Sequence, residues 1–164
     1  MKVEFINPFI ESVYEMFTTM LACEAKRGDV NIGKPNPSKT QEVVAMIGLS
    51  GPVRGNVAMS FPSRTAQHMV SRLLGVETMG VDETVLDAMS EMVNIVAGGA
   101  KARLNGDVGS PINLSLPTVV QGRDYRVDYP SWAVWLDVPF TSELGPFNLR
   151  VIFESNAMKK GENS

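Results

Sequence analysis

The sequence has few of the residues that small enzymes use for metal binding and nucleophilic catalysis. Its 164 residues include one cysteine, Cys23, and one histidine, His68. A single cysteine excludes an intrachain disulfide and a cysteine-based zinc cluster, and we interpret Cys23 as a small buried residue near a helix end. A Ser-His-Asp triad would have to use His68, which lies inside a predicted helix without a nucleophile motif, so we interpret it as a surface or packing residue.

Positive charge and long apolar runs are also scarce. The 15 basic and 18 acidic residues give a net charge of -3, so the chain lacks the basic excess that neutralises nucleic-acid phosphates. No stretch approaches the roughly 20 apolar residues that span a bilayer, and the N-terminus does not have the pattern of a signal peptide. No metal-ligand or phosphate-loop motif occurs. We therefore expect a cytoplasmic protein that binds neither nucleic acid nor membrane and has no metal site of its own.

What is present is a series of amphipathic segments. Apolar residues at three-and-four spacing predict helices, and alternation predicts strands. The predicted helices run from Asn7 to about Cys23, from Pro62–Ser63 to Gly75, and from Asp82 to about Leu104–Gly106. The predicted strands cover 42–49, 53–61, 112–121 with a break at Pro117, 125–129, 132–140 and 147–153, while 27–40 is predicted to be a loop. Asn7 and Asp82 are the predicted N-caps of the two long helices.

A weak internal sequence repeat relates the two halves of the chain. Gly51-Pro52-Val53 resembles Gly145-Pro146-Phe147, and similar alternation follows each triplet. Aligning the long helices that precede the two hairpins places Glu11 over Asp87, Glu15 over Glu91 and Thr18 over Asn94. A duplicated helix-plus-hairpin unit would explain this repeat.

The long helix that begins after Asp82 carries the most informative face. Its apolar residues form one stripe, and Asp87, Glu91, Asn94 and Gly98 fall on the opposite stripe at about 100° per residue. An asparagine amide cannot act as a base at neutral pH, but it donates and accepts hydrogen bonds and can hold a water molecule in line for attack. A carboxylate one turn away can pair with a lysine of a partner. Taken alone, a Glu-x-x-Asn pair is common on helices, and an ordinary solvated helix surface is the favoured interpretation.

The spacing of four residues favours a site. Asp87, Glu91, Asn94 and Pro117 are separated by three, two and twenty-two residues. This pattern resembles the signature of the chemotaxis phosphatase family that includes CheC, CheX and FliY. The segments 116–122 and 7–13 also look like those of CheX. The resemblance covers about residues 5–154.

The resemblance implies a phosphatase that hydrolyses the aspartyl phosphate of a CheY-type response regulator in two-component signalling. Asn94 would orient the attacking water, and Glu91 would contact the lysine in the regulator's active site. Asp87 and Gly98 would belong to the partner-docking face, and Pro117 would fix a strand beneath the helix. Magnesium would be held by the regulator's own acidic pocket, so this chain would bind no cofactor.

The same resemblance separates a two-site type from a single-site type. CheC-like relatives carry a Glu-x-x-Asn pair in each half, whereas CheX-like relatives keep only the second pair. Because the first helix here carries Glu15 and Thr18, the chain resembles the single-site type. CheX-like proteins form homodimers whose sheets join, and the predicted strand Trp132 to Phe140, with Trp135, is a candidate for that edge.

We therefore predict an α/β (α+β) fold in which an antiparallel sheet with a pseudo-twofold internal repeat is covered by two long helices and a shorter one. Residues 1–154 are expected to form a single domain, and 155–164 a disordered tail. An adaptor that binds a response regulator or a flagellar component without hydrolysis is the alternative function. Only the enzyme needs the amide of Asn94. A purely structural domain would leave the polar stripe without explanation.

Overall fold

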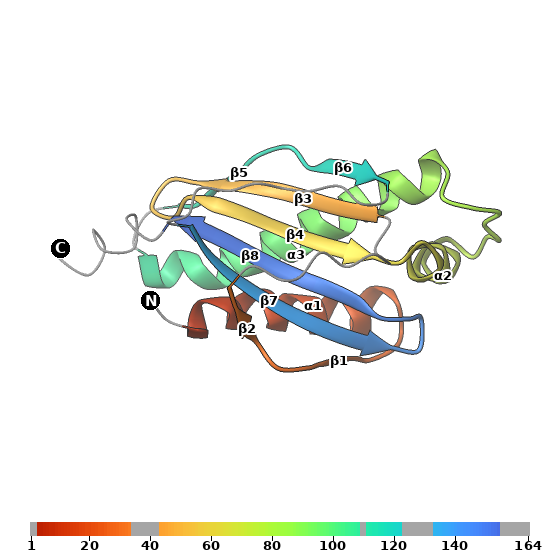
Figure 1. Ribbon diagram of the computed structural model, residues 1–164, viewed down its shortest axis with the longest axis horizontal. Helices are drawn as coiled ribbons and strands as arrows, with labels where there is room; N and C mark the ends of the chain where they lie inside the picture. The colour runs from red at the N-terminus through yellow and green to blue at the C-terminus, as the bar shows by residue number, and fades with distance from the viewer. Residues whose placement is uncertain (1–2, 34–42, 109–110, 123–132, 155–164) are drawn as a thin grey trace.

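The computed structural model describes residues 3–33, 43–108, 111–122 and 133–154 (Figure 1). Its helices are the short 3-10 helix η1 (Val3–Ile6), α1 (Asn7–Met20), α2 (Ser63–Leu74) and α3 (Glu83–Val108). Its strands are β1 (Ala25–Arg27), β2 (Asn31–Ile32), β3 (Val43–Ser50), β4 (Gly55–Phe61), β5 (Asn113–Leu114), β6 (Thr118–Gln121), β7 (Ala133–Ser142) and β8 (Phe147–Glu154). None of the described helices is long and apolar enough to cross a membrane.

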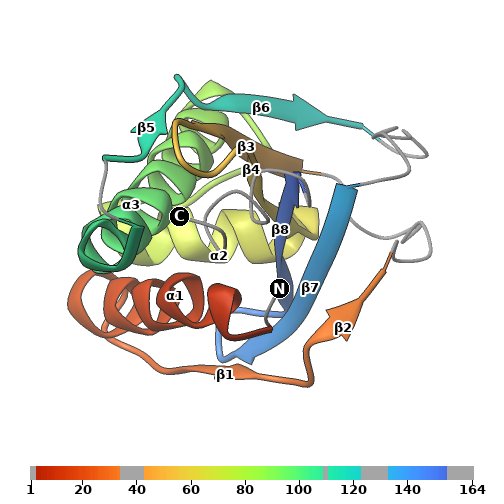
Figure 2. The same ribbon diagram turned by 90° about the vertical axis from the view of Figure 1, so that its left-hand side faces the viewer.

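The described strands form one 8-stranded antiparallel sheet. The order is β1-β7-β8-β4-β3-β5, with β2 also paired to β7 and β6 also paired to β3. Helices α1 and α3 lie side by side over one face of this sheet (Figure 2), and α2 packs against α3 and β4. The predicted fold class, an antiparallel sheet with two long helices and one shorter helix, is confirmed.

The core lies between this face of the sheet and the two long helices. Alternate residues of β8, from Phe147 to Phe153, are at most 1% exposed, as the two-residue period of a half-buried strand requires. Phe17 of α1 stacks on Phe147, which stacks on Phe140 of β7, with ring centroids 5.1 and 5.0 Å apart. These aromatic contacts fix α1 on the sheet and leave α3 as its neighbour in the helical layer.

The centre of the sheet agrees with the internal repeat. The repeat aligns each residue of the first hairpin with the residue 94 positions later. Val57 and Val151, which are 94 positions apart, pair directly across β4 and β8. A residue that pairs with its own counterpart marks a local twofold axis. On either side of this axis, β3 and β7 occupy equivalent places in the sheet.

The helix boundaries follow the predicted signals with one exception. Asp82 caps α3, since its Oδ1 accepts a hydrogen bond from the Val85 amide at 3.0 Å, and α2 ends at Gly75 with a φ of 67°. Asn7 is not a cap, because η1 runs directly into α1 and Ile6 occupies the N-cap position without a side-chain bond. Because Phe5 and Ile6 are buried in the core, the helical segment begins before Asn7, where the capping preference places its start.

The predicted hairpins are confirmed, but two strands were missed. β1 and β2 lie in the segment from Ala25 to Ile32, of which 27 onward was predicted to be a loop. Their residues are mostly exposed, so no hydrophobic period reveals them, and pairing with β7 alone defines them. As a result β7 is paired on both sides, and the prediction that it forms a free edge for a dimer is wrong. The predicted strand at 125–129, Trp132 and the 155–164 tail lie outside the described residues.

The face of the sheet away from α1 and α3 carries a buried ion pair. The carboxylate of Asp137 lies 3.4 Å from Nε of Arg150 and accepts a hydrogen bond from Asn148 at 3.0 Å. The side chains of Asp137 and Arg150 are 7% and 21% exposed, and the guanidinium lies 5.4 Å from the ring centroid of Trp135. A charge this poorly solvated depends on its partner.

We predict that Asp137→Ala lowers the free energy of unfolding by about 3 kcal/mol, because it removes the carboxylate that pairs with the partly buried Arg150. Glu143→Ala, which removes the exposed ion pair between Glu143 and Arg72, is the matched control and should cost less than about 1 kcal/mol. Urea unfolding followed by circular dichroism measures both. Equal losses in the two variants would contradict this account.

Candidate functional site

The candidate site lies on α3, whose two stripes face different surroundings. One stripe is buried against the sheet and α1, through Val85, Met89, Met92, Val93, Val96, Ala97, Ala100 and Leu104. On the opposite stripe Asp87 and Glu91 are exposed, while Asn94 and Gly98 are half-buried. Burial of the apolar stripe fixes the rotation of the helix about its axis. The polar stripe is therefore held outward on a rigid element.

Glu91 and Asn94 lie one helical turn apart on this stripe, so their side chains project from neighbouring points of one surface. Among the residues that the structure describes, no hydrogen bond or ion pair engages the side chain of Glu91, Asn94 or Asp87. The carboxylate is free to accept a cation, and the amide is free to donate and accept hydrogen bonds at once. The predicted site residues thus lie together on one open face of α3.

The two adjacent glycines of α3 have different surroundings. A Cβ at Gly98 would meet nothing within 4 Å, whereas a Cβ at Gly99 would collide with the hydroxyl of Ser12 on α1. Gly99 therefore permits the close approach of α1 and α3. Gly98 lies on the open stripe and keeps the surface beside Asn94 free of side-chain bulk.

We predict opposite effects for the two alanine variants. Gly99→Ala should lower the free energy of unfolding by about 1–3 kcal/mol, because α1 must move away or Ser12 must change its rotamer. Gly98→Ala should raise it by up to about 1 kcal/mol, since alanine is the better helix former and has open space here. Thermal and urea unfolding of both variants would test this, and destabilisation by Gly98→Ala would contradict it.

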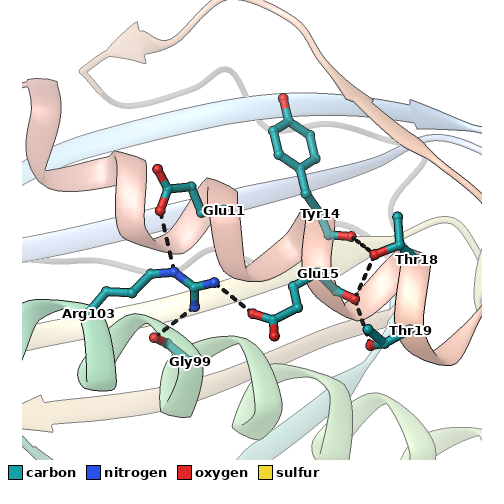
Figure 3. A network of polar contacts seen from close by, with 7 residues as sticks. All are labelled: Glu11, Tyr14, Glu15, Thr18, Thr19, Gly99 and Arg103. Carbon is teal, nitrogen blue, oxygen red and sulfur yellow. Dashed lines mark hydrogen bonds and ion pairs between the residues drawn. The ribbon is translucent and has the colours of Figure 1, made fainter.

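The corresponding face of α1 is closed by an ion-pair network (Figure 3). Arg103 of α3 pairs with Glu15 at 2.6 Å and with Glu11 at 3.3 Å, and it donates to the carbonyl of Gly99 at 3.1 Å. The hydroxyl of Thr18 lies 3.1 Å from the carbonyl oxygens of both Tyr14 and Glu15 in its own helix. Here the acidic side chains already have a cation, and no amide is present. The carboxylates of α1 are therefore occupied, whereas that of Glu91 is open.

The unequal lengths of the helices explain the difference between the two halves. The alignment of α1 with α3 relates residues 76 positions apart, so the counterpart of Arg103 is Arg27. Because α1 ends at Met20, Arg27 lies in β1, where it pairs with Phe140. The longer α3 places Arg103 beside the acidic residues of α1, whereas the shorter α1 places no arginine beside Glu91. Sequence reasoning missed this role of Arg103; the only signal was a cation one turn after Gly99.

A second group of polar residues joins α2 to the turn between β7 and β8. Arg72 donates to the carbonyl of Leu21 and to Glu143, both at 3.0 Å, and Nδ1 of His68 lies 3.2 Å from the carbonyl of Leu144. Burial, then the charge of Glu143, raises the pKa of the Cys23 thiol, which disfavours the reactive thiolate. These contacts hold α2 against the end of α1 and the turn between β7 and β8.

Among the described residues, no cluster of three or more His, Cys, Asp or Glu could hold a metal ion.

Comparisons with known proteins give a matching family model and a related sequence. The model of the family described as chemotaxis phosphatase CheX matches residues 43–141. The CheY-P phosphatase CheX of Thermotoga maritima is 34% identical over 146 residues, which are 86% of this chain and 89% of that protein.

Solved structures show the same fold. The CheC-like superfamily protein from Shewanella sp. PV-4 has a TM-score of 0.84 and 33% identity, over 94% of this chain and 100% of that chain. A chain in the CheX–CheY–BeF3–Mg complex from Borrelia burgdorferi has a TM-score of 0.72 and 23% identity, over 94% of this chain and 100% of that chain, and shares the fold.

Proposed function

Because the chain belongs to the chemotaxis phosphatase CheX family, we propose that it hydrolyses the aspartyl phosphate of a CheY-type response regulator. Membership of this family makes it a protein phosphatase. The observation that carries the proposal is the open pair of Glu91 and Asn94 on α3, at the spacing that the sequence shares with the family. The equivalent face of α1 has neither a free carboxylate nor an amide.

In this proposal Asn94 positions the water that attacks the phosphoryl group. Its carbonyl oxygen accepts a hydrogen bond from the water while its NH2 group donates to another oxygen, which holds the water in one orientation. Orienting a reactant in this way lowers the activation free energy without any proton transfer by the side chain. The rigid helix and the half-buried position of Asn94 restrict the amide to few rotamers.

Glu91 docks the regulator by pairing with a lysine of its active site. A carboxylate repels a phosphoryl group, so its favourable partner is the cation beside that group. The pairing would also draw the lysine away from the phosphate. We propose that magnesium is held by the acidic pocket of the regulator. The complex from Borrelia burgdorferi, which contains CheY, BeF3 and magnesium, supports a CheY-like partner.

Asn94→Ala should slow the decay of the phosphorylated regulator by about 100-fold or more relative to wild type, because the water loses its orientation. Binding of the regulator should change little. Thr18→Ala, the equivalent change on α1, is the matched control and should leave hydrolysis unaltered. Decay of the phosphoryl group in the presence of magnesium gives the rates. If the wild type binds the regulator without speeding decay, the chain is an adaptor and the enzymatic proposal fails.

Glu91→Lys should raise the Kd for the regulator by about tenfold or more, because it reverses the charge that pairs with the lysine. Glu15→Lys is the matched control, since the carboxylate of Glu15 is occupied by Arg103. Titration of the magnesium- and beryllofluoride-loaded regulator measures both constants. An unchanged Kd for Glu91→Lys would remove Glu91 from the docking face.

We also propose that the chain acts as a cytoplasmic homodimer. β7 is excluded as the joining edge because it pairs with β8 on one side and with β1 and β2 on the other. The outer edges of the described sheet are formed by β1 and β2 at one end and by β5 and β6 at the other. A continuous sheet between two copies would use one of these edges.

A further inference from the structure

We propose that Leu116 is an apolar anchor that binds the response regulator beside α3. This inference rests on the proposed function, since it adds a contact to the same docking face. Leu116 precedes β6 and is 88% exposed. The polar stripe of α3 can orient a partner, but charged and polar contacts contribute more to orientation and association rate than to affinity. A few side chains that fill desolvated pockets supply most of the affinity in specific interfaces, and an exposed leucine gains free energy when it is buried in such a pocket.

The backbone on either side of Leu116 is fixed. Ser115 is bound to Gly48 of β3 twice: its amide donates to the Gly48 carbonyl at 3.0 Å, and its hydroxyl accepts from the Gly48 amide at 2.8 Å. The same hydroxyl donates to the carbonyl of Leu116 at 3.0 Å. Pro117 then restricts φ on the other side. A leucine held in this way loses little backbone entropy when it binds.

The connection that contains Leu116 lies on the same side of the molecule as α3. Leu114 and Val119, at its two ends, pack against the core, and β6 packs against α3. Figure 2 shows the link between β5 and β6 beside α3, and along the horizontal axis of Figure 1 this link lies level with the central part of the helix. Glu91 and Asn94 lie in that central part. A partner that binds the polar stripe of α3 therefore lies next to this connection.

Other exposed apolar side chains are less suited to this role. The exposed large apolar residues of the described chain are Met20, Ile32, Leu74, Val76, Met79, Leu116 and Val120. Met79 is fully exposed, but its neighbours hold the backbone less firmly. The hydroxyl of Thr78 makes only a long 3.4 Å hydrogen bond to Gln67, and the residue that follows is Gly80. Ile32 is 67% exposed on β2, which pairs with β7 near the opposite end of the sheet. Among these described residues, Leu116 combines high exposure, a fixed backbone and a place beside the middle of α3.

The test compares Leu116→Ala with Ile32→Ala, the matched control at the far edge of the sheet. Leu116→Ala should raise the Kd for the magnesium- and beryllofluoride-loaded regulator about tenfold, which corresponds to about 1.4 kcal/mol. It should raise KM similarly and leave kcat within about twofold, because the anchor does not touch the reacting atoms. Ile32→Ala should match the wild type. Because both side chains are exposed, neither variant should lose stability.

Three results are decisive. If the wild type hydrolyses the phosphoryl group and Leu116→Ala retains wild-type Kd and KM, Leu116 is not an anchor, although the proposed function stands. If Leu116→Ala lowers the mass of the protein in light scattering without changing the Kd, Leu116 contacts a second copy of the chain and the inference is overturned. If the wild type neither binds nor dephosphorylates the regulator, the proposed function itself fails.

Discussion

The close approach of α1 and α3 at Gly99 is the constraint on which the functional face depends. Only a residue without a side chain lets the Ser12 hydroxyl lie against α3, and the contact brings Arg103 within reach of two carboxylates of α1. With α3 held between α1 and the sheet, its apolar stripe has one possible orientation. The stripe with Glu91 and Asn94 must then face outward. Interhelical packing, more than any local feature of the site, decides what the protein presents to a partner.

The same contact makes two related halves unequal. A pseudo-twofold axis at the pair Val57 and Val151 relates the two hairpins, yet one long helix ends at Met20 and the other continues to Val108. The extra turns of α3 carry the arginine that neutralises the acidic face of α1. A difference in helix length, which appears remote from chemistry, thus leaves one half with a free carboxylate and the other with an occupied one.

The sequence predicted those parts of the structure that local periodicity determines. The capping of α3 by Asp82, the turn after Leu74 and the two hairpins all follow from short-range patterns, and they are confirmed. Asn7 was misassigned because burial of Phe5 and Ile6 overrides the capping preference. The short strands β1 and β2 have no hydrophobic period, so only their pairing with β7 reveals them. For the candidate site, the stripe was predictable, whereas the ion pairs of Arg103 depend on which helix becomes its neighbour.

The pairing of β4 with β8 at the centre of the sheet has a consequence for how the chain folds. β8 is the last strand in the described order, and the residues that it joins, such as Val57 and Val151, are far apart in sequence. Such non-local pairings slow folding because the entropy of closing a long loop is lost before the contacts form. During synthesis, the edge of β4 that pairs with β8 therefore has no partner until residues 147–154 have left the ribosome. Until then the nascent chain carries an unpaired edge of β4, and this interval is when it is most exposed to aggregation.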